Sequence, residues 1–485
     1  MRLWNKDIHR VIFAILFSIT IVFFVFNFFY GERIQHNDGL GWDGAAYADW
    51  AQRDSAEILS SKSVSNYYIG RILPSFIVHF FSEFTGYDIS TSSTVIKAFY
   101  IYNSVLLISI FYVLCLIGKH YKWNDKVYFL AFISVFFNYP VLKNFSYNPT
   151  LTDMSGYFLG VLAFYFYIRR NNFAILLSML VGAFVWPTVI YACLAFLIFG
   201  HGVMEERKPR LHSKMLGLTL PVLLISLAAY LFFFEGLKQL NGTTSLNKEL
   251  LPLSLLLFVA YMFSAVFRFI DIPEALKAIK IRNLKYALMA IVLFMVTKFI
   301  ISFLSNGDPG PLTAVKYLGL FTQASLTNPL INVVAHANHY GPFYILLIFI
   351  WPQIVSYAKS EGLGLVAFCF IFAFLSIGCE SRQFINAWPV FALISCHVLF
   401  LKYHENITWV FVYSMLIISL VTSRFWLDIN VGVWTGNFQE FPDQMLYMYS
   451  GPWMSHLMYS VFAGLSIVVG IAVYSLLENL KPEKV

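Results

Sequence analysis

One stretch sets the organisation of this chain: His36-Asn37-Asp38-Gly39-Leu40-Gly41-Trp42-Asp43-Gly44-Ala45-Ala46-Tyr47-Ala48-Asp49-Trp50-Ala51, which comes after the first apolar run at residues 11–30. It contains three carboxylates, four Gly or Asn residues and two Trp. Gly and Asn favour tight turns, so the stretch predicts a shaped polar segment at the end of a hydrophobic helix. The rest of the chain decides what that segment does.

The composition predicts an integral membrane protein. Of the 485 residues, 59% are hydrophobic and only 12% are charged, against roughly 45–50% and about 25% in soluble domains. The mean hydropathy is +0.69. Apolar runs of about 20 residues recur along the chain, and this is the length that a helix needs to cross a bilayer.

Charge placement predicts the topology. Arg2, Lys6 and Arg10 precede the first apolar run, so the positive-inside rule places the N-terminus in the cytoplasm. Most of the other Lys and Arg then fall in loops on that side, whereas most of the acids fall outside. We expect about 14 spans, with both termini cytoplasmic.

The predicted fold class is therefore an all-α integral membrane bundle, a single polytopic domain over residues 1–485. The polar stretch belongs to a first external loop, residues 31–93, in which residues 45–62 and 67–81 predict pieces that lie at the membrane interface. Further external segments are expected at 305–340 and 423–455. After the first run, spans are expected at about 94–118, 127–142, 154–168, 215–234, 251–270, 286–304, 341–357, 363–378, 384–401, 407–422 and 456–476.

Residues 173–201 are long enough for one span, yet the charges on both flanks are typical of the cytoplasm. Two short helices hinged at Trp186-Pro187 would resolve this conflict, because proline interrupts a helix and half-length helices are tolerated where the protein buries them.

Asp43 is the candidate catalytic residue, with Asp38 as its partner. A carboxylate that turns hold at the outer membrane edge can act as a general base towards a sugar hydroxyl. An ordinary solvated loop with Asx turns explains the same pattern equally well.

The spacing Asp43-x-x-x-Tyr47-x-x-x-Ala51, right after the first span, resembles the first external loop of GT-C glycosyltransferases. In that family an acid-x-x-x-Tyr signature opens an amphipathic helix. Trp42-Asp43-Gly44 is also similar to the Trp-Asp-Gly variant of some mannosyltransferases. The family usually has a second acid beside the first, where this chain has Gly44. The resemblance covers roughly residues 1–200 and the topology, and it implies a GT-C-like bundle in which Trp42 and Tyr47 help to bind the acceptor.

Asp153 stands at the start of a predicted span, after Asn148-Pro149-Thr150. Capping of the helix is one interpretation. The resemblance implies another, because these enzymes often carry an acid here that faces the first across a cavity. Asp153 would then orient the acceptor or help to hold a divalent cation such as Mg²⁺ or Mn²⁺, since hard cations prefer carboxylate oxygen. No other cofactor is expected.

Cationic side chains at the outer edge are the expected ligands of a donor phosphate, because arginine matches phosphate geometry. These residues are Arg71, Lys143, Arg382 and Arg424. Arg382 is the preferred candidate, since Glu380-Ser381-Arg382-Gln383 forms a very short turn between two spans, and charges there are costly. A Glu380–Arg382 ion pair is the structural alternative.

His336 and His339 lie three residues apart in the segment 305–340. Such a pair can bind a metal, but no nearby acid completes a ligand set. We therefore expect polar contacts with the acceptor.

The chain has no nucleotide-phosphate loop, no dinucleotide fingerprint and no basic patch with stacked aromatics, so neither nucleotides nor nucleic acids are expected partners. The expected partners are a lipid-phosphate-linked sugar donor, a lipid-linked glycan acceptor and membrane lipids. The resemblance implies an inverting hexosyltransferase that uses undecaprenyl phosphate hexose at the periplasmic face of a bacterial inner membrane. It is similar to the phage-type O-antigen glucosyltransferases that modify lipopolysaccharide.

Two other classes stay open. A flippase or transporter of lipid-linked sugars also has many spans, but flippases usually consist of two similar halves with charges along a central pathway. A polysaccharide polymerase or ligase would favour a dominant late external loop with Arg and His, which residues 305–340 only partly provide.

Overall fold

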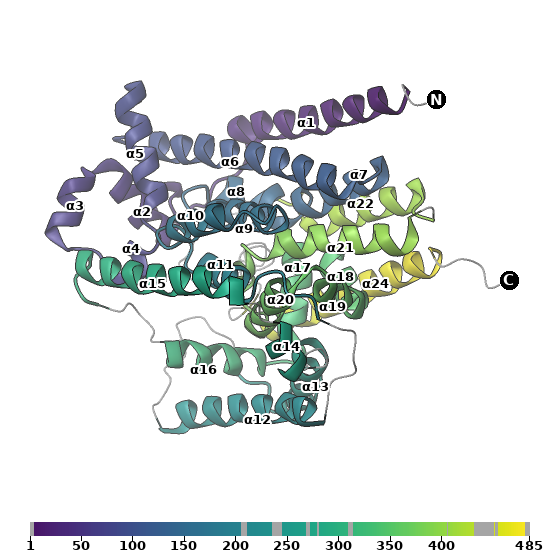
Figure 1. Ribbon diagram of the computed structural model, residues 1–485. Coiled ribbons are helices and arrows are strands. Elements are labelled where there is room, and N and C mark those ends of the chain that lie inside the picture. Colours follow the sequence, from purple (N-terminus) through teal and green to yellow (C-terminus); the bar gives the residue numbers. More distant parts are fainter. Residues whose placement is uncertain are drawn as a thin grey trace.

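The computed structural model describes residues 4–204, 211–234, 245–267, 272–278, 281–308, 314–404, 406–430, 451 and 454–480. Within these residues the chain is helical and has no β-strand (Figure 1). The predicted all-α class is confirmed to that extent. Two predicted external segments lie partly outside the described residues, namely 305–340 at 309–313 and most of 423–455.

Short helices fill the first loop between two long ones. The bounds are α1 Trp4–Tyr30, η1 His36–Gly39, α2 Asp43–Gln52, α3 Ser55–Ser61, α4 Asn66–Ile69, α5 Leu73–Thr85 and α6 Ser92–Tyr121. Local chemistry sets these bounds. The Asp54 carboxylate accepts a 2.7 Å hydrogen bond from the Ala56 N–H and caps α3, whereas α5 ends at Gly86, whose φ is 69°. Both loop segments predicted at the interface, 45–62 and 67–81, are mainly helical.

The rest of the chain continues as helices of varied length. Their bounds are α7 Asp125–Phe136, η2 Pro140–Asn144, α8 Phe145–Tyr147, α9 Asp153–Ile168, α10 Asn172–Gly182, α11 Thr188–Phe199, α12 Leu211–Phe234, α13 Leu251–Met262, η3 Phe263–Phe267, α14 Ile272–Ala278, α15 Ile281–Leu304, α16 Ala314–Ser325, α17 Ile331–Tyr340, α18 Pro342–Phe349, α19 Trp351–Glu361, α20 Leu363–Leu375, η4 Ser381–Phe384, α21 Trp388–Tyr403, α22 Trp409–Ser423 and α24 His456–Glu478.

Three helices of the described chain are long and apolar enough to cross a membrane, namely Ser92–Tyr121, Leu284–Leu304 and His456–Glu478. Two bent helix pairs raise the number to five if each pair is one span, and further apolar helices have 10–17 residues. These lengths and compositions are consistent with a membrane protein. The expectation of about 14 spans stays a prediction.

The segment before Asp153 differs from its prediction. α7 ends at Phe136, and the chain then bends by 56° into η2 and α8. Proline has no N–H to continue a helix, and Pro140 stands at this bend. The predicted span 127–142 therefore corresponds to a bent helix pair, which is either one broken span or a re-entrant loop. Residues 143–153 are buried inside the protein.

The predicted hinge at Trp186-Pro187 is confirmed, because α10 and α11 are separate helices on either side of it. The linker between them is tied to the first loop, since the Leu73 N–H donates a 3.0 Å hydrogen bond to the Phe184 carbonyl. This bond fixes the start of α5 beside Trp186.

Figure 1 shows how these pieces are arranged. The first turn of α1 and the last turn of α24 lie at one end of the molecule, and α2 to α5 lie at the opposite end. α12, α13 and α16 form a layer below the main bundle in this view. The largest hydrophobic cluster joins α6, α7, α9, α11, α18, α20 and α21. This core supports the segments that carry the charged residues described next.

Candidate functional site

Asp43 is the first residue of α2 and follows a tight turn. Asn37 shapes this turn, since its side-chain amide donates a 2.8 Å hydrogen bond to the Gly41 carbonyl. The Asp43 carboxylate is half-buried and accepts a 3.3 Å hydrogen bond from the Tyr68 hydroxyl of α4. A helix N-terminus favours negative charge. The first loop thus holds Asp43 in one orientation while leaving it accessible.

Asp38, the predicted partner of Asp43, is exposed in η1 and has a φ of 53°. It forms no hydrogen bond or ion pair with the described residues. This placement gives no support to a shared catalytic role, because left-handed turn geometry alone explains an Asp at this position.

Asp153 and Arg382 form a bidentate ion pair. The Nε and Nη2 atoms of Arg382 donate hydrogen bonds of 2.8 Å and 2.9 Å to the two carboxylate oxygens. The Asp153 side chain is 3% exposed and that of Arg382 is 29% exposed. Burial disfavours the charge on Arg382, but Asp153 raises the Arg382 pKa well above its usual value.

This placement corrects one interpretation of Asp153. The N-cap residue of α9 is Thr152, so Asp153 does not cap the helix. Both carboxylate oxygens accept hydrogen bonds from Arg382, and the roles of Asp153 in orienting the acceptor or holding a divalent cation stay predictions. The alternative of a Glu380–Arg382 ion pair is also wrong, because Arg382 pairs with Asp153, which lies 229 residues away in the sequence.

Arg71 is a buried cation that has no carboxylate partner in the described part of the chain. Its side chain is 4% exposed, and its guanidinium lies 4.3 Å from the ring centroid of Tyr67 and 4.5 Å from that of Trp186. It forms no ion pair with the described residues, and its Nε atom and the Trp186 Nε1 atom have no hydrogen-bond partner among them. Buried donors of this kind suit an anionic ligand oxygen.

Glu380 completes the arrangement, although the sequence pattern indicated it only as a partner for Arg382. It is half-buried, and its charge interacts with those of Arg382, Arg71 and Asp43. Burial raises the pKa of the Glu380 carboxyl above its usual value, against the opposing effect of the two arginines. The sequence did contain a signal for a functional role of Glu380, because an acid in a short turn between two apolar segments is costly.

These five residues, Asp43, Arg71, Asp153, Glu380 and Arg382, are called the charged centre below. The charges of Asp43 and Glu380 act on Arg382, and the charge of Arg382 acts on Arg71. The centre therefore unites α2, the α4–α5 junction, α9 and the turn before α21. It brings an accessible carboxylate close to cationic groups, as acid–base chemistry on a phosphate-bearing substrate requires.

The predicted acceptor-binding aromatics differ in exposure. Trp42 is 37% exposed and stacks on the His36 ring at 4.7 Å between centroids. Tyr47 is fully buried, and its ring packs edge-on against Trp50 and Tyr68. Acceptor contact stays a prediction for both Trp42 and Tyr47.

The two histidines also lie inside the protein. The His336 Nδ1 atom is 3.0 Å from the Ser381 hydroxyl, and its Nε2 atom is 3.1 Å from the Ser376 carbonyl. Both ring nitrogens have partners within the protein, and the acceptor contact of His336 stays a prediction. His339 is also buried, with its ring 5.2 Å from that of Tyr139. Within the described residues, no group of three or more His, Cys, Asp or Glu could hold a metal ion.

Lys143 and Arg424 both form hydrogen bonds with other parts of the protein. The Lys143 ammonium donates hydrogen bonds of 2.6 Å to Glu32 and 2.9 Å to the Leu427 carbonyl. Arg424 ends α22 and bonds Asn338, with 3.0 Å from Nη2 to the Asn338 carbonyl. The fold therefore engages both cations, and their donor-phosphate role stays a prediction.

Comparison with protein-family models, with curated proteins and with solved structures found no match. The chemistry of the charged centre therefore has to be inferred from its own geometry.

Proposed function

We propose that this protein is a GT-C-like membrane glycosyltransferase, which moves a hexose from polyprenyl phosphate to a lipid-linked glycan such as O-antigen. One observation carries the proposal: an accessible carboxylate, Asp43, lies in the same charged centre as Arg71, a buried cation with no carboxylate partner among the described residues. A base for the acceptor and a counter-charge for the leaving phosphate are the two groups that such a transfer needs.

In the proposed reaction, Asp43 accepts the proton of the acceptor hydroxyl. The hydroxyl oxygen forms a bond with the anomeric carbon while the bond from that carbon to the phosphate oxygen breaks, which inverts the configuration. The phosphate leaves with the electron pair. Arg71 stabilises its charge, because a guanidinium stacked between two rings needs no reorganisation to bind an anion.

Arg382 has a secondary role in this proposal, since Asp153 already neutralises it. Its remaining exposed edge can still contact the phosphate or the sugar. We place the reaction at the periplasmic face of a bacterial inner membrane, with both termini in the cytoplasm. The positive-inside distribution of Lys and Arg supports this orientation.

The first test is a substitution with a matched control on the same helix. Asp43→Asn removes the proposed base but keeps the size of the side chain, and we expect it to lower transfer by about 100-fold or more. Asp49→Asn changes an exposed acid of α2 that pairs with Arg53, and it should keep nearly full activity. The measurement is release of free polyprenyl phosphate by purified protein given polyprenyl phosphate hexose and acceptor glycan. Substantial activity in Asp43→Asn would reject this role.

The same assay distinguishes the glycosyltransferase from a flippase. A flippase would move the lipid-linked sugar across a vesicle membrane without releasing polyprenyl phosphate. Release would then stay at background in the wild type and in Asp43→Asn alike.

A further inference from the structure

Four exposed cations gather where α6 and α9 end. They are Lys119 and Lys122 at the end of α6, and Arg169 and Arg170 directly after α9. The two pairs are neighbours, since the charge of Arg169 acts on the ring of His120, the residue after Lys119. These four cations are called the basic rim below.

The basic rim has no carboxylate partner in the described part of the chain. None of its four cations forms an ion pair there, whereas Arg53 in the first loop pairs with both Asp49 and Glu57. Glu361 also acts on His120, but its carboxylate accepts a 3.3 Å hydrogen bond from the Tyr357 hydroxyl. The positive charge of the rim is therefore open to an anion from outside.

Apolar side chains continue from the basic rim along the same helices. On α6, Val105 and Tyr112 precede Lys119 at intervals of seven residues, so the three side chains lie on one face. Val105 and Tyr112 are 55% and 64% exposed. α10 begins just after the rim, and its Phe173 and Leu177 are 66% and 48% exposed. An exposed charge beside an exposed apolar face fits the two parts of a phospholipid.

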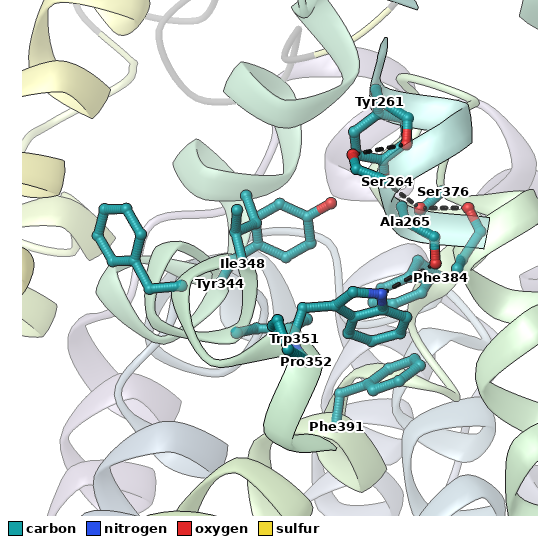
Figure 2. A pocket seen from close by; sticks show the side chains of 13 residues that line it. Tyr261, Ser264, Ala265, Tyr344, Ile348, Trp351, Pro352, Ser376, Phe384 and Phe391 are labelled. Carbon is teal, nitrogen blue, oxygen red and sulfur yellow. Dashed lines mark hydrogen bonds between the residues drawn. The ribbon is translucent and has the colours of Figure 1, made fainter. Parts of the chain in front are cut away.

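The pocket between η3 and α18 to α21 offers no counter-charge to an anion. Its volume is about 360 Å³, and its wall consists of apolar and hydroxyl-bearing residues (Figure 2). The Tyr261 and Ser376 hydroxyls are 2.6 Å apart, and the Trp351 indole donates a 2.9 Å hydrogen bond to the Ala265 carbonyl. An anionic headgroup is therefore expected at the basic rim and not in this pocket.

We propose that the basic rim binds the headgroup of an anionic phospholipid, whose acyl chains lie along the exposed faces of α6 and α10. The lipid belongs to the leaflet at the end of the molecule where the first turn of α1 lies (Figure 1), which is the cytoplasmic leaflet in the predicted topology. Charge complementarity selects this occupant, because clustered Lys and Arg at a membrane edge recognise anionic headgroups. A soluble acidic protein would leave the neighbouring apolar side chains exposed. The inference does not rest on the proposed function.

Native mass spectrometry of the full-length protein tests the proposal. The protein is titrated with phosphatidylglycerol and, separately, with phosphatidylcholine that carries the same acyl chains. We expect the first phosphatidylglycerol to bind at least about tenfold more tightly. This preference should weaken as the salt concentration rises, because salt screens exposed charges. Glycerol 1-phosphate at the same concentration should not displace the lipid, since it has no acyl chains.

Three double variants make the experiment sharper. Arg169→Gln with Arg170→Gln should remove most of the preference for phosphatidylglycerol, whereas Arg169→Lys with Arg170→Lys should keep most of it, because lysine retains the charge. Arg53→Gln with Lys62→Gln is the matched control, since it removes two cations from the first loop, and it should behave like the wild type. Thermal unfolding in detergent checks that each variant is folded.

Equal affinities for the two lipids in the wild type would overturn the proposal and leave the basic rim to a soluble acidic partner. A preference that survives the loss of both arginines would also overturn it, because the anionic lipid would then bind elsewhere. Displacement by glycerol 1-phosphate would identify a free phosphate compound as the ligand and reject the lipid. These outcomes are independent of sugar transfer.

Discussion

Two arginines of the charged centre show how one residue type takes two roles. Arg382 is neutralised by both oxygens of Asp153, whereas Arg71 is stacked between Tyr67 and Trp186 with no carboxylate partner in the described chain. Sequence alone preferred Arg382, because its short turn between two spans is conspicuous. Only the fold reveals that Asp153 reaches it, since ion pairs between distant segments depend on tertiary packing.

The Asp153–Arg382 pair leads to a prediction of stability. Asp153→Asn leaves Arg382 without its counter-charge, and we expect the free energy of unfolding to fall by roughly 3 kcal/mol, since removing one partner of a buried pair is strongly destabilising. Thermal unfolding in detergent measures the change. Adding Arg382→Gln should recover part of the loss, because the two sites are coupled. Purely additive effects of the two substitutions would contradict this coupling.

At the scale of elements, the exit of α1 is held by Glu32. Its carboxylate binds Lys143 and accepts hydrogen bonds from the Ile429 and Asn430 N–H groups. Burial acts to raise the pKa of Glu32. The hydrogen bonds from Lys143 and from the two N–H groups lower it by more, so the net pKa is below the ordinary value of 4.5. This one carboxylate therefore joins α1, η2 and the chain after α22.

The lowered pKa predicts how stability depends on pH. The stabilisation by ionised Glu32 is fully present above pH 4.5, the ordinary value, and is lost as the pH falls through the lower pKa of the folded state. At pH 7 we expect Glu32→Gln to cost roughly 2 kcal/mol, as charged hydrogen bonds do.

Thermal unfolding from pH 7 downwards checks this expectation. The difference between wild type and Glu32→Gln should shrink as the pH falls below 4.5. Glu57→Gln is the control, because it removes an exposed pair with Arg53 and should change stability little. If the difference in stability between wild type and Glu32→Gln grows as the pH falls, the predicted lowering of the Glu32 pKa is wrong.

Element boundaries could be predicted where a side chain dictates them. The hinge at Trp186-Pro187 and the helices of the first loop were expected from proline and from mixed polarity. The bend at Pro140 was not predicted, although a proline marks it as Pro187 marks the hinge. The apolar run passes through Pro140 without a change in hydropathy. The burial of residues 143–153 had no local signal, since it depends on α6, α9 and the described chain just after α22 packing around them.

For the whole molecule, membrane character followed from composition, and the helical class is confirmed. The number of spans and the side of each loop stay predictions. The structure places α2 to α5 at the end opposite the first turn of α1 and the last turn of α24 (Figure 1), which fits a first loop and chain ends on different sides.

Added cysteines test this orientation. Ser63→Cys lies in the exposed connection between α3 and α4, and Ser360→Cys lies in the exposed last turn of α19. In spheroplasts, a membrane-impermeant thiol reagent should label the first variant and label the second only after permeabilisation. The background should be low, because four of the five native cysteines are buried and Cys115 is partly buried. The reverse pattern would invert the topology.

Gly44 has a consequence for anyone who wishes to redesign this protein. A Cβ atom built at Gly44 would lie 2.0 Å from the Thr150 hydroxyl oxygen, so the acid pair usual in the similar transferases cannot be installed by a single exchange. Positions 44 and 150 form one steric unit, and a larger residue at the first requires a smaller one at the second. Libraries that vary the two together should yield folded proteins where single-site libraries fail.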